Sequence, residues 1–286
     1  MAYGSSNITG TTAAVFRPNI WAKMAQKARE ANLVLAPLVH RYDRDVQSSG
    51  QTVEIPFVSN LTVLQKAANT VIDTQAPTQT KVTVTINQHW YSSVFIEDFA
   101  EIQSAYDLAA LYSEKCGYAV AEKIDNFIAA QMTAGFTTNV VGTYGTPLTY
   151  AVVRQAKLKL DIAKVPLESR VFVVTPQGHD DLLGIDQFTR YDAMGASGQP
   201  SAFETGKIGY LLGMKVYMSQ NLIVTAGTPI QNNNLMFHKD AYALAVQRDI
   251  KFERQRKTEY LADLVVASAL WGGTVLRNDH GVLVRS

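Results

Sequence analysis

Three consecutive residues have types that could support catalysis or metal binding. His179, Asp180 and Asp181 place an imidazole beside two carboxylates, a set that could bind a cation or act in acid–base chemistry. Acidic residues also suit the start of a helix, where their charge complements the helix dipole. We favour the helix start, and a metal-dependent hydrolase that uses these three residues is the less favoured alternative.

A glycine-rich stretch is the second candidate, because glycines ahead of a helix can cradle a phosphate. Gly206, Gly209 and Gly213 fit neither the Walker spacing G-x-x-x-x-G-K-[ST] nor the dinucleotide spacing G-x-G-x-x-G. An alternating, strand-like run follows Gly213 where a phosphate site would need a helix. We therefore predict a structural turn that leads into a strand.

The other reactive residue types show no catalytic or metal-binding pattern. The five histidines are isolated, without a second histidine or cysteine at ligand spacing, and no G-x-S-x-G motif is present. The single cysteine, Cys116, lies on an apolar helical stripe, where a buried and unreactive thiol is expected. We expect no catalytic residue, no metal ion and no cofactor, and therefore no enzyme.

Composition argues against a strongly charged partner. The chain of 286 residues has 26 Lys and Arg against 25 Asp and Glu, and 47% of its residues are hydrophobic. This near-neutral balance predicts a folded protein without tight or sequence-specific nucleic-acid binding. One cysteine, no secretory signal and no apolar run of membrane-spanning length lead us to expect a soluble protein made in the cytoplasm.

The first elements that could position a site are an arm and a helix. Residues 1–16 are rich in Gly, Ser, Thr and Asn, which predicts a flexible arm. Apolar residues then recur at three- and four-residue steps, which predicts a helix from Pro18 to about Leu35 that Pro37 ends.

Residues 50–98 change to the two-residue period of strands. “GQTVEIPFV” predicts an edge strand, because Pro56 cannot donate to a ladder on both sides. The apolar alternation from Val82 to Ile96 would span roughly 50 Å, too long for a compact domain. We expect an extended hairpin whose edges another chain covers, with contact candidates at Val82, Val84 and Trp90.

A long helix is predicted next. The apolar stripe within residues 104–135 corresponds to a rod of roughly 45 Å. Ser104 and Asp107 fit a capping box, and Gly135 fits the end of the helix. Gly117 inside the stripe predicts a close packing contact or a bend.

The remainder alternates between helix and strand. We predict a helix from Thr146 and Pro147 to about Ala163, a buried strand at “SRVFVVTP” and a short helix at “QGHDDLLGI”. Further strands at “MKVYMSQNLI” and “LMFHKDAYALAV” are separated by the loop “TAGTPIQNNN”. Residues 248–286 predict a charged strand, an apolar strand, a Gly-rich turn and a last strand.

Charges of both signs gather between Asp249 and Glu259. The intersubunit contact candidates in this tract are Lys251, Glu253, Arg254, Arg256 and Glu259. Opposite charges side by side argue against a phosphate-binding stripe, which would be basic throughout. The tract is either a solvated edge strand or a set of charges that pairs with neighbouring subunits.

Several stretches, taken in chain order, carry a family resemblance over nearly the whole sequence. They are “FRPNIWAKMAQKAREANLVLAPLV”, “GQTVEIPFV”, “IDNFIAA”, “LDIAKVPLESRVFVVTPQGHDDLL”, “TGKIGYLLGMKVYMSQNL” and “FHKDAYALAVQRDIKFERQR”. Together with the Gly-rich C-terminal strand, they resemble tailed-bacteriophage major capsid proteins of the Hong Kong 97 type. The stretch that begins at Thr205 is the strongest match.

The resemblance implies an α+β fold with four parts. These would be an N-terminal arm at 1–40, an extended two-stranded loop at 41–98, an axial domain at 138–240, and a peripheral domain. The peripheral domain would combine a long spine helix at 99–137 with return strands at 241–286. The overlong strand would then lie across a neighbouring subunit, which explains its length.

The resemblance also implies a structural role. Subunits would form the hexamers and pentamers of an icosahedral or prolate head that encloses double-stranded DNA and touches it without specificity. A separate scaffolding protein and a portal would be partners, with a decoration protein as an open option. The location would be the virion capsid, after assembly in the cytoplasm of a bacterial host, and an encapsulin-like compartment of the same fold is the close alternative.

Overall fold

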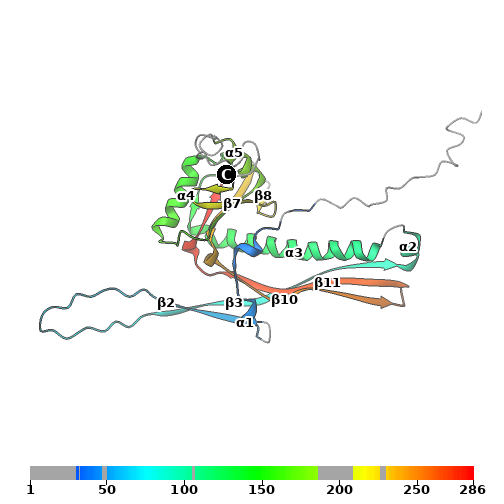
Figure 1. The fold of residues 1–286 in the computed structure, drawn as a ribbon, viewed down its shortest axis with the longest axis horizontal. Helices are drawn as coiled ribbons and strands as arrows, with labels where there is room; N and C mark the ends of the chain where they lie inside the picture. The colour runs from blue at the N-terminus through cyan, green and yellow to red at the C-terminus, as the bar shows by residue number, and fades with distance from the viewer. Residues whose placement is uncertain (1–29, 32, 47–49, 105–106, 186–208, 226–229) are drawn as a thin grey trace, which may run out of the picture.

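The computed structural model describes residues 30–31, 33–46, 50–104, 107–185, 209–225 and 230–286. These residues form a long sheet of five strands and a smaller sheet of seven strands that stands on it (Figure 1). We call the first the peripheral sheet and the second the axial sheet. The predicted mixture of helices and strands is confirmed.

The peripheral sheet has the strand order β1-β10-β11-β3-β2. Its strands are β1 (His40–Arg41), β2 (Thr52–Val58), β3 (Gln79–Glu97), β10 (Tyr242–Lys257) and β11 (Ala262–Val275). β2 lies at an edge, as Pro56 predicted, and β3 runs for 19 residues, which confirms the overlong strand. The short helix α1 (Asp43–Val46) precedes β2, and the loop from residue 59 to residue 78 joins β2 to β3.

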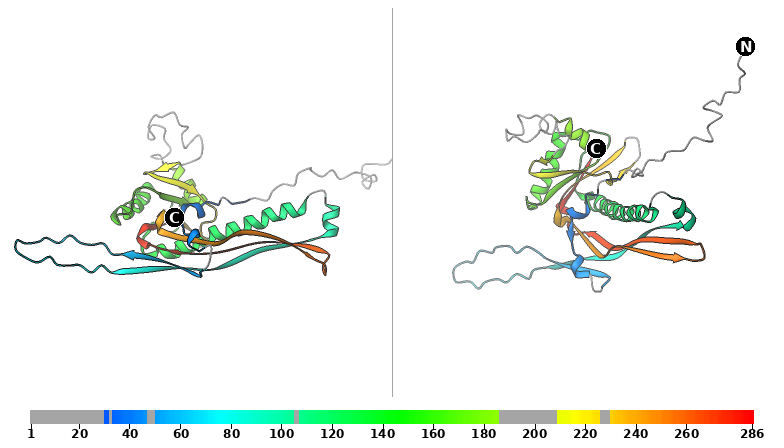
Figure 2. Two further views of the ribbon diagram at one scale, coloured as in Figure 1. Left: turned by 60° about the horizontal axis from the view of Figure 1, so that its bottom comes forward. Right: turned by 45° about the vertical axis from the view of Figure 1, so that its right-hand side comes forward.

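The predicted long helix is α3 (Leu108–Gly135), which lies along one face of the peripheral sheet (Figure 2). The short helix α2 (Asp98–Gln103) precedes it. The predicted cap was wrong by three residues, because Asp107 rather than Ser104 is the N-cap and accepts from the Ala110 amide. A methyl group added at Gly117 would lie 2.7 Å from the Phe252 ring, so this glycine permits close packing of α3 on β10.

No helix in the described part of the chain combines the length and the hydropathy needed to cross a membrane. Cys116 is buried on α3, as its position on the apolar stripe predicted.

The predicted N-terminal helix is wrong where the structure describes it. Residues 30, 31, 33 and 34 are not helical, and Pro37 lies inside a 3₁₀ turn, η2 (Ala36–Leu38), instead of ending a helix. The buried carboxylate of Asp125 on α3 anchors this segment by accepting from the amides of Val34, Leu35 and Ala36. Residues 1–29, and with them the predicted flexible arm, lie outside the described residues.

The axial sheet has the order β4-β12-β9-β5-β7-β6, and β8 also pairs with β9. Its strands are β4 (Val140–Val141), β5 (Arg170–Val174), β6 (Tyr210–Leu211), β7 (Met214–Met218), β8 (Val224–Thr225), β9 (Gln231–His238) and β12 (Gly281–Arg285). Helices α4 (Tyr150–Ile162) and α5 (Pro176–Leu183) pack on one face, where Leu160 and Leu182 join Phe172 in a buried cluster. The other face packs on the C-terminal part of α3, where Met132 is fully buried, as is Phe136 directly after the helix.

Two predictions about the last third of the chain were wrong. Asn232, Asn233 and Asn234 were assigned to a loop but are buried within β9. Asn234 can be buried there because its side chain accepts from the Thr175 amide at 2.8 Å and donates to the Val284 carbonyl at 3.3 Å. The Gly-rich turn is also absent from residues 272–273, which lie inside β11. Gly272 lies against the backbone of β3, and Gly273 lies against the Tyr242 ring of β10.

Three 3₁₀ turns meet where the two sheets join. They are η3 (Phe136–Thr138), η4 (Lys239–Ala241) and η5 (Asn278–His280). η4 divides the single strand predicted for “LMFHKDAYALAV” into β9 and β10, and η5 carries the chain from β11 to β12. The Asn139 side chain donates to the Asn278 carbonyl at 3.1 Å, so two of the turns are tied together.

Candidate intersubunit surfaces

The histidine and aspartates considered for catalysis serve the local structure of the axial body, by which we mean the axial sheet with α4 and α5. Asp181 accepts from the Leu148 amide at 2.9 Å and from the Gln177 side chain at 3.3 Å. His179 is half-buried, and burial lowers its pKa. Neither aspartate is in the first turn of α5, so the predicted complement to the helix dipole was wrong. Within the described residues, no group of three His, Cys, Asp or Glu is placed to hold a metal ion.

The glycine stretch forms a turn where the structure describes it. Leu212 and Gly213 have φ of 49° and 84° and connect β6 to β7 as the central residues of a two-residue hairpin. Gly209 has open space where a side chain would stand, and Gly206 lies outside the described residues. A structural turn, rather than a phosphate site, fits Gly213.

The charged tract forms the outer part of β10, on an edge of the peripheral sheet. In the described chain, β1 pairs with β10 only at Ala243 and Leu244, so the later residues have no strand on that side. Lys251, Glu253, Arg254, Arg256 and Glu259 are all exposed. The edge-strand interpretation therefore describes the tract within one subunit.

Several of these charges are already paired inside the subunit. Lys251 contacts Glu253 at 2.7 Å, and Arg254 contacts Asp263 at 2.5 Å. Arg256 binds Asp98, and this hydrogen bond holds the pKa of Asp98 below its usual value. Lys251 likewise lowers the pKa of Glu253 through their hydrogen bond. Exposed pairs of this kind contribute little to folding, so these residues stay contact candidates rather than sources of stability.

The three contact candidates on β3 differ in how exposed their side chains are to a neighbouring subunit. Val84 is fully buried in a cluster with Val46 and Ile86, so packing within the subunit accounts for it and we no longer propose it as a contact. Val82 is half-buried near the base of the hairpin. Trp90 is 42% exposed, with the Lys123 ammonium 4.3 Å from its ring centroid.

The loop at the end of the β2–β3 hairpin carries apolar side chains with no core of its own. Every residue from Val58 to Lys81 is exposed, and Val63 is 100% exposed. Polar contacts hold the two sides of the loop together, such as the one from the Gln75 side chain to the Thr62 carbonyl at 2.6 Å. The large apolar residues exposed on this hairpin tip are Val58, Leu61, Val63, Leu64, Val71 and Ile72.

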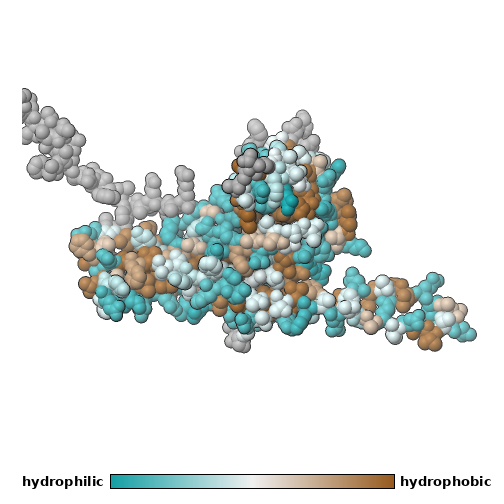
Figure 3. All heavy atoms as spheres, turned by 180° about the vertical axis from the view of Figure 1, so that it is seen from behind, coloured by the Kyte–Doolittle hydropathy of each residue, from teal (hydrophilic) through white to brown (hydrophobic). Residues whose placement is uncertain are grey.

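A second exposed apolar group lies at the opposite end of the long axis. It combines the end of β3, α2 and the turn between β10 and β11, and Figure 3 shows apolar residues gathered at that end. Phe95 and Tyr260 lie with ring centroids 5.8 Å apart, and both are exposed. The large apolar residues of this distal end are Phe95, Phe99, Ile102, Tyr260 and Leu261.

Comparison with known proteins assigns the chain to a family. The family described as phage capsid protein matches residues 33–285. The chain belongs to this family. It is a major capsid protein of the tailed-phage type, and it forms the shell of a phage head.

Solved capsid structures share the fold across nearly the whole chain. A chain from Mycobacterium phage Che8 is 28% identical, with a TM-score of 0.79, and the match covers 94% of this capsid protein and 97% of that chain. The capsid structure of cyanophage P-SCSP1u gives 22% identity and a TM-score of 0.77, with 98% and 96% covered. The head structure of Helicobacter pylori bacteriophage KHP40 gives 11% identity and a TM-score of 0.78, with 99% of both chains covered. No curated protein matches the chain.

The fold shared with these structures is the Hong Kong 97 fold that the sequence resemblance implied. The capsid protein is accordingly a structural component of the virion, in which many copies form the shell.

The sequence reasoning missed the apolar residues at both ends of the capsid protein. In the hairpin loop they are scattered among Thr, Asn, Ala and Gln, without the alternation of a strand or the spacing of a helix. The available signal was their presence in a loop predicted to leave the body, because apolar residues in such a loop need a partner to cover them.

Proposed function

We propose that this capsid protein assembles into hexamers and pentamers that close into an icosahedral or prolate head around double-stranded DNA. The observation that carries the proposal is the hairpin tip, whose apolar side chains have nothing to pack against within the described subunit. An uncovered apolar surface of this kind marks an interaction site. A neighbouring subunit is the occupant that a shell of many copies supplies.

The hairpin is proposed to lie across the neighbouring subunit, with the distal apolar end in contact with further copies. Each contact is modest, since a standard interface buries about 800 Å² per partner, but every subunit makes several of them. Charge pairs on β10 would add specificity at subunit junctions more than affinity. We retain the proposed division into arm (1–40), extended loop (41–98), axial part (138–240) and peripheral parts (99–137 and 241–286).

The first test is assembly of the full chain, expressed alone and with a candidate scaffolding protein, followed by electron microscopy and sedimentation. Rings or closed shells are expected in at least one condition. A chain that stays monomeric in both conditions would contradict the proposal.

The role of the hairpin has a matched test. Val63→Asp should abolish or strongly reduce shells while leaving thermal unfolding of the isolated subunit unchanged, because Val63 contacts no core. Gln65→Asp is the control, since it adds the same charge to the same loop without removing an apolar side chain. Equal assembly of both variants would rule out the hairpin as a contact.

The remaining partners are proposed from the family. We propose a separate scaffolding protein, a portal, an optional decoration protein, non-specific contact with packaged DNA, and assembly in the cytoplasm of a bacterial host. An encapsulin-like compartment would carry protein cargo instead, so the nucleic-acid content of particles purified from infected cells distinguishes the two. The matches to phage heads support the capsid.

We further propose that the subunit acts without catalysis. The hydrolase alternative would need Asp180 and Asp181, and Asp181 is already engaged by the Leu148 amide. Asp180 is exposed, so Asp180→Ala should leave shell assembly intact, as measured by particle yield.

A further inference from the structure

The outer face of α4 exposes apolar side chains that the fold of the subunit does not explain. Leu158 and Ile162 lie one turn apart on this helix, and Leu167 follows in the next loop. Ile162 is 71% exposed, whereas Val153 and Leu160 on the other side of the helix are fully buried against the axial sheet. α4 therefore has two apolar faces, and the sheet uses one of them.

The opposite flank of the axial body carries a hollow. Its volume is about 560 Å³, and it lies beside β8, the start of α5, Ser286 and residues 145–147, which lead into the first turn of α4. Its walls are mainly apolar and include Pro147, Pro176, Val224 and Ile230. Val224 and Ile230 are themselves about half exposed, so their side chains are available to a partner.

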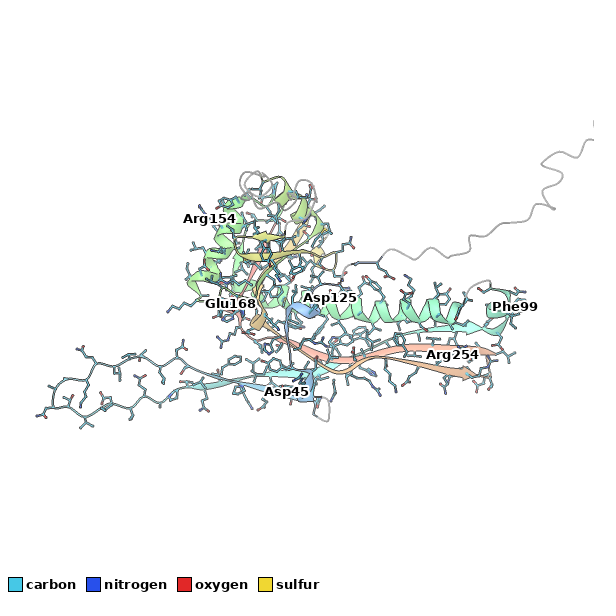
Figure 4. All side chains as sticks on the ribbon, in the orientation of Figure 1. Asp45, Phe99, Asp125, Arg154, Glu168 and Arg254 are labelled. Carbon is cyan, nitrogen blue, oxygen red and sulfur yellow. The ribbon has the colours of Figure 1, made fainter. Side chains whose placement is uncertain are left out.

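The two flanks also differ in charge. Arg154 and Lys164 are exposed beside the apolar face of α4, and Figure 4 shows Arg154 on the outer side of the body. Asp161 on the same helix is paired with Arg170, whose hydrogen bond holds the pKa of Asp161 low. Among the described residues that line the hollow, Asp181 is present and no Lys or Arg is. The face of α4 thus carries two exposed cations and an exposed anion, Glu168, beside its apolar residues, and the described lining of the hollow carries one carboxylate side chain and no cationic one.

The placement of the two flanks prevents one subunit from filling its own hollow. α4 and β8 lie on opposite sides of the axial body in Figure 1. The β2–β3 hairpin projects toward the same side as α4. Two different, complementary surfaces on opposite sides are what a head-to-tail contact needs, and such a contact closes into a ring when repeated around an axis.

We propose that Leu158, Ile162 and Leu167 of one subunit pack into the hollow beside β8 of the next subunit. This inference rests on the proposed assembly into hexamers and pentamers, and it names the contact that closes those rings. The hairpin of the first subunit then reaches over the same neighbour. The occupant is a second copy of this chain, because the chain itself carries an exposed apolar face, flanked by two cations, that complements the hollow.

Cysteine cross-linking in assembled particles tests the contact. Ile162→Cys combined with Val224→Cys should give, under mild oxidation, a ladder of dimers, trimers and larger cross-linked species on denaturing gels. A head-to-tail contact predicts a ladder, whereas two identical faces that meet would give dimers only. The native Cys116 is buried, so it should contribute little background.

One control pair and the two single variants keep the result specific. Tyr112→Cys on α3 replaces Ile162→Cys in the control pair, and each single variant serves as a further control. Rings and shells without a ladder would overturn this inference while leaving the proposed function intact, and so would dimers from Ile162→Cys alone. If the unmodified chain forms no rings at all, both proposals fail.

A second variant tests the contact without cross-linking. Ile162→Asp should reduce ring formation at least tenfold in sedimentation, with an unchanged unfolding curve because the side chain is outside the core. Normal rings from this variant would contradict the proposed contact.

Discussion

The two sheets of the capsid protein bury their strands in opposite ways. All five residues of β5 in the axial sheet are buried, because helices cover one face and the spine helix covers the other. In the peripheral sheet, the residues of β3 alternate between exposed and covered, and β10 is exposed over most of its outer half. The central strand β5 of the axial sheet is covered within the subunit, and the outer part of the edge strand β10 is not.

The difference shows where each sheet obtains its stability. Burial of apolar surface contributes about 25 cal/mol per Å², so the axial sheet gains most of its stability when the subunit folds. In the proposed assembly, the ends and edges of the peripheral sheet gain theirs when other subunits cover them. The same residue type should therefore matter to folding in one sheet and to assembly in the other.

The largest expected difference between the two sheets is between two phenylalanines. Phe172→Ala in β5 should lower the free energy of unfolding of the subunit by about 3–5 kcal/mol, because the ring is fully buried. Phe95→Ala in β3 should cost far less, because that ring is 56% exposed in the isolated subunit. Urea unfolding of unassembled subunits measures both values. Equal losses would contradict the division between the two sheets.

A smaller effect is expected from the carboxylate that joins the N-terminal segment to α3. Asp125→Ala leaves the amides of Val34, Leu35 and Ala36 without their acceptor, at a cost of about 2 kcal/mol or more. Hydrogen exchange at these three amides should accelerate well before exchange in the axial sheet changes. Asp125→Asn keeps one acceptor oxygen and should give an intermediate result; unchanged exchange in both variants would contradict the role of Asp125.

The junction between the sheets should respond to acid. His280 is buried beside His238, with ring centroids 5.9 Å apart, and burial chiefly lowers its pKa. Below the ordinary value of 6.5, the unfolded chain binds a proton that the folded chain resists, so stability should fall as pH drops from about 6.5 toward the lowered pKa. Urea unfolding at pH 7.5 and 5.5 should show a smaller loss for His280→Asn, and an equal loss would exclude this histidine.

The smallest effect is expected at the exposed edge of the peripheral sheet. Arg256→Gln breaks the pairs with Asp98 and Asp263. Arg256 and Asp98 are solvent-screened at the surface, and Asp263, whose side chain is only 16% exposed, keeps its pair with Arg254. The free energy of unfolding should change within experimental error, while particle yield falls if the tract contacts a neighbour. A clear loss of subunit stability would show that these pairs do contribute to folding.

Periodicity and turn chemistry made the main elements predictable from the sequence. The two-residue alternation of β3, the apolar stripe of α3 and the proline in β2 each reflect a local geometric requirement. These patterns can be read from the sequence because residues on one face of an element share one environment along its length.

The failures came from interactions between residues far apart in the sequence. Asn234 lies in a strand because Thr175 and Val284 satisfy its side chain, and neither partner is near it in the chain. Val34 and Leu35 do not continue a helix because Asp125, about 90 positions away, accepts from their amides. The exposed face of α4 was missed for a related reason, since a pattern that predicts one buried face gives no sign of a second one.

The contact at Asp125 also sets an order on folding during synthesis. Residues 34–36 leave the ribosome first but cannot dock until the chain has grown by about 90 residues to include their acceptor. At 5–20 residues per second this delay is roughly 5–20 s, during which Leu35 has no partner on α3. The N-terminal segment of a nascent subunit is thus accessible to chaperones for several seconds before α3 is available to bind it.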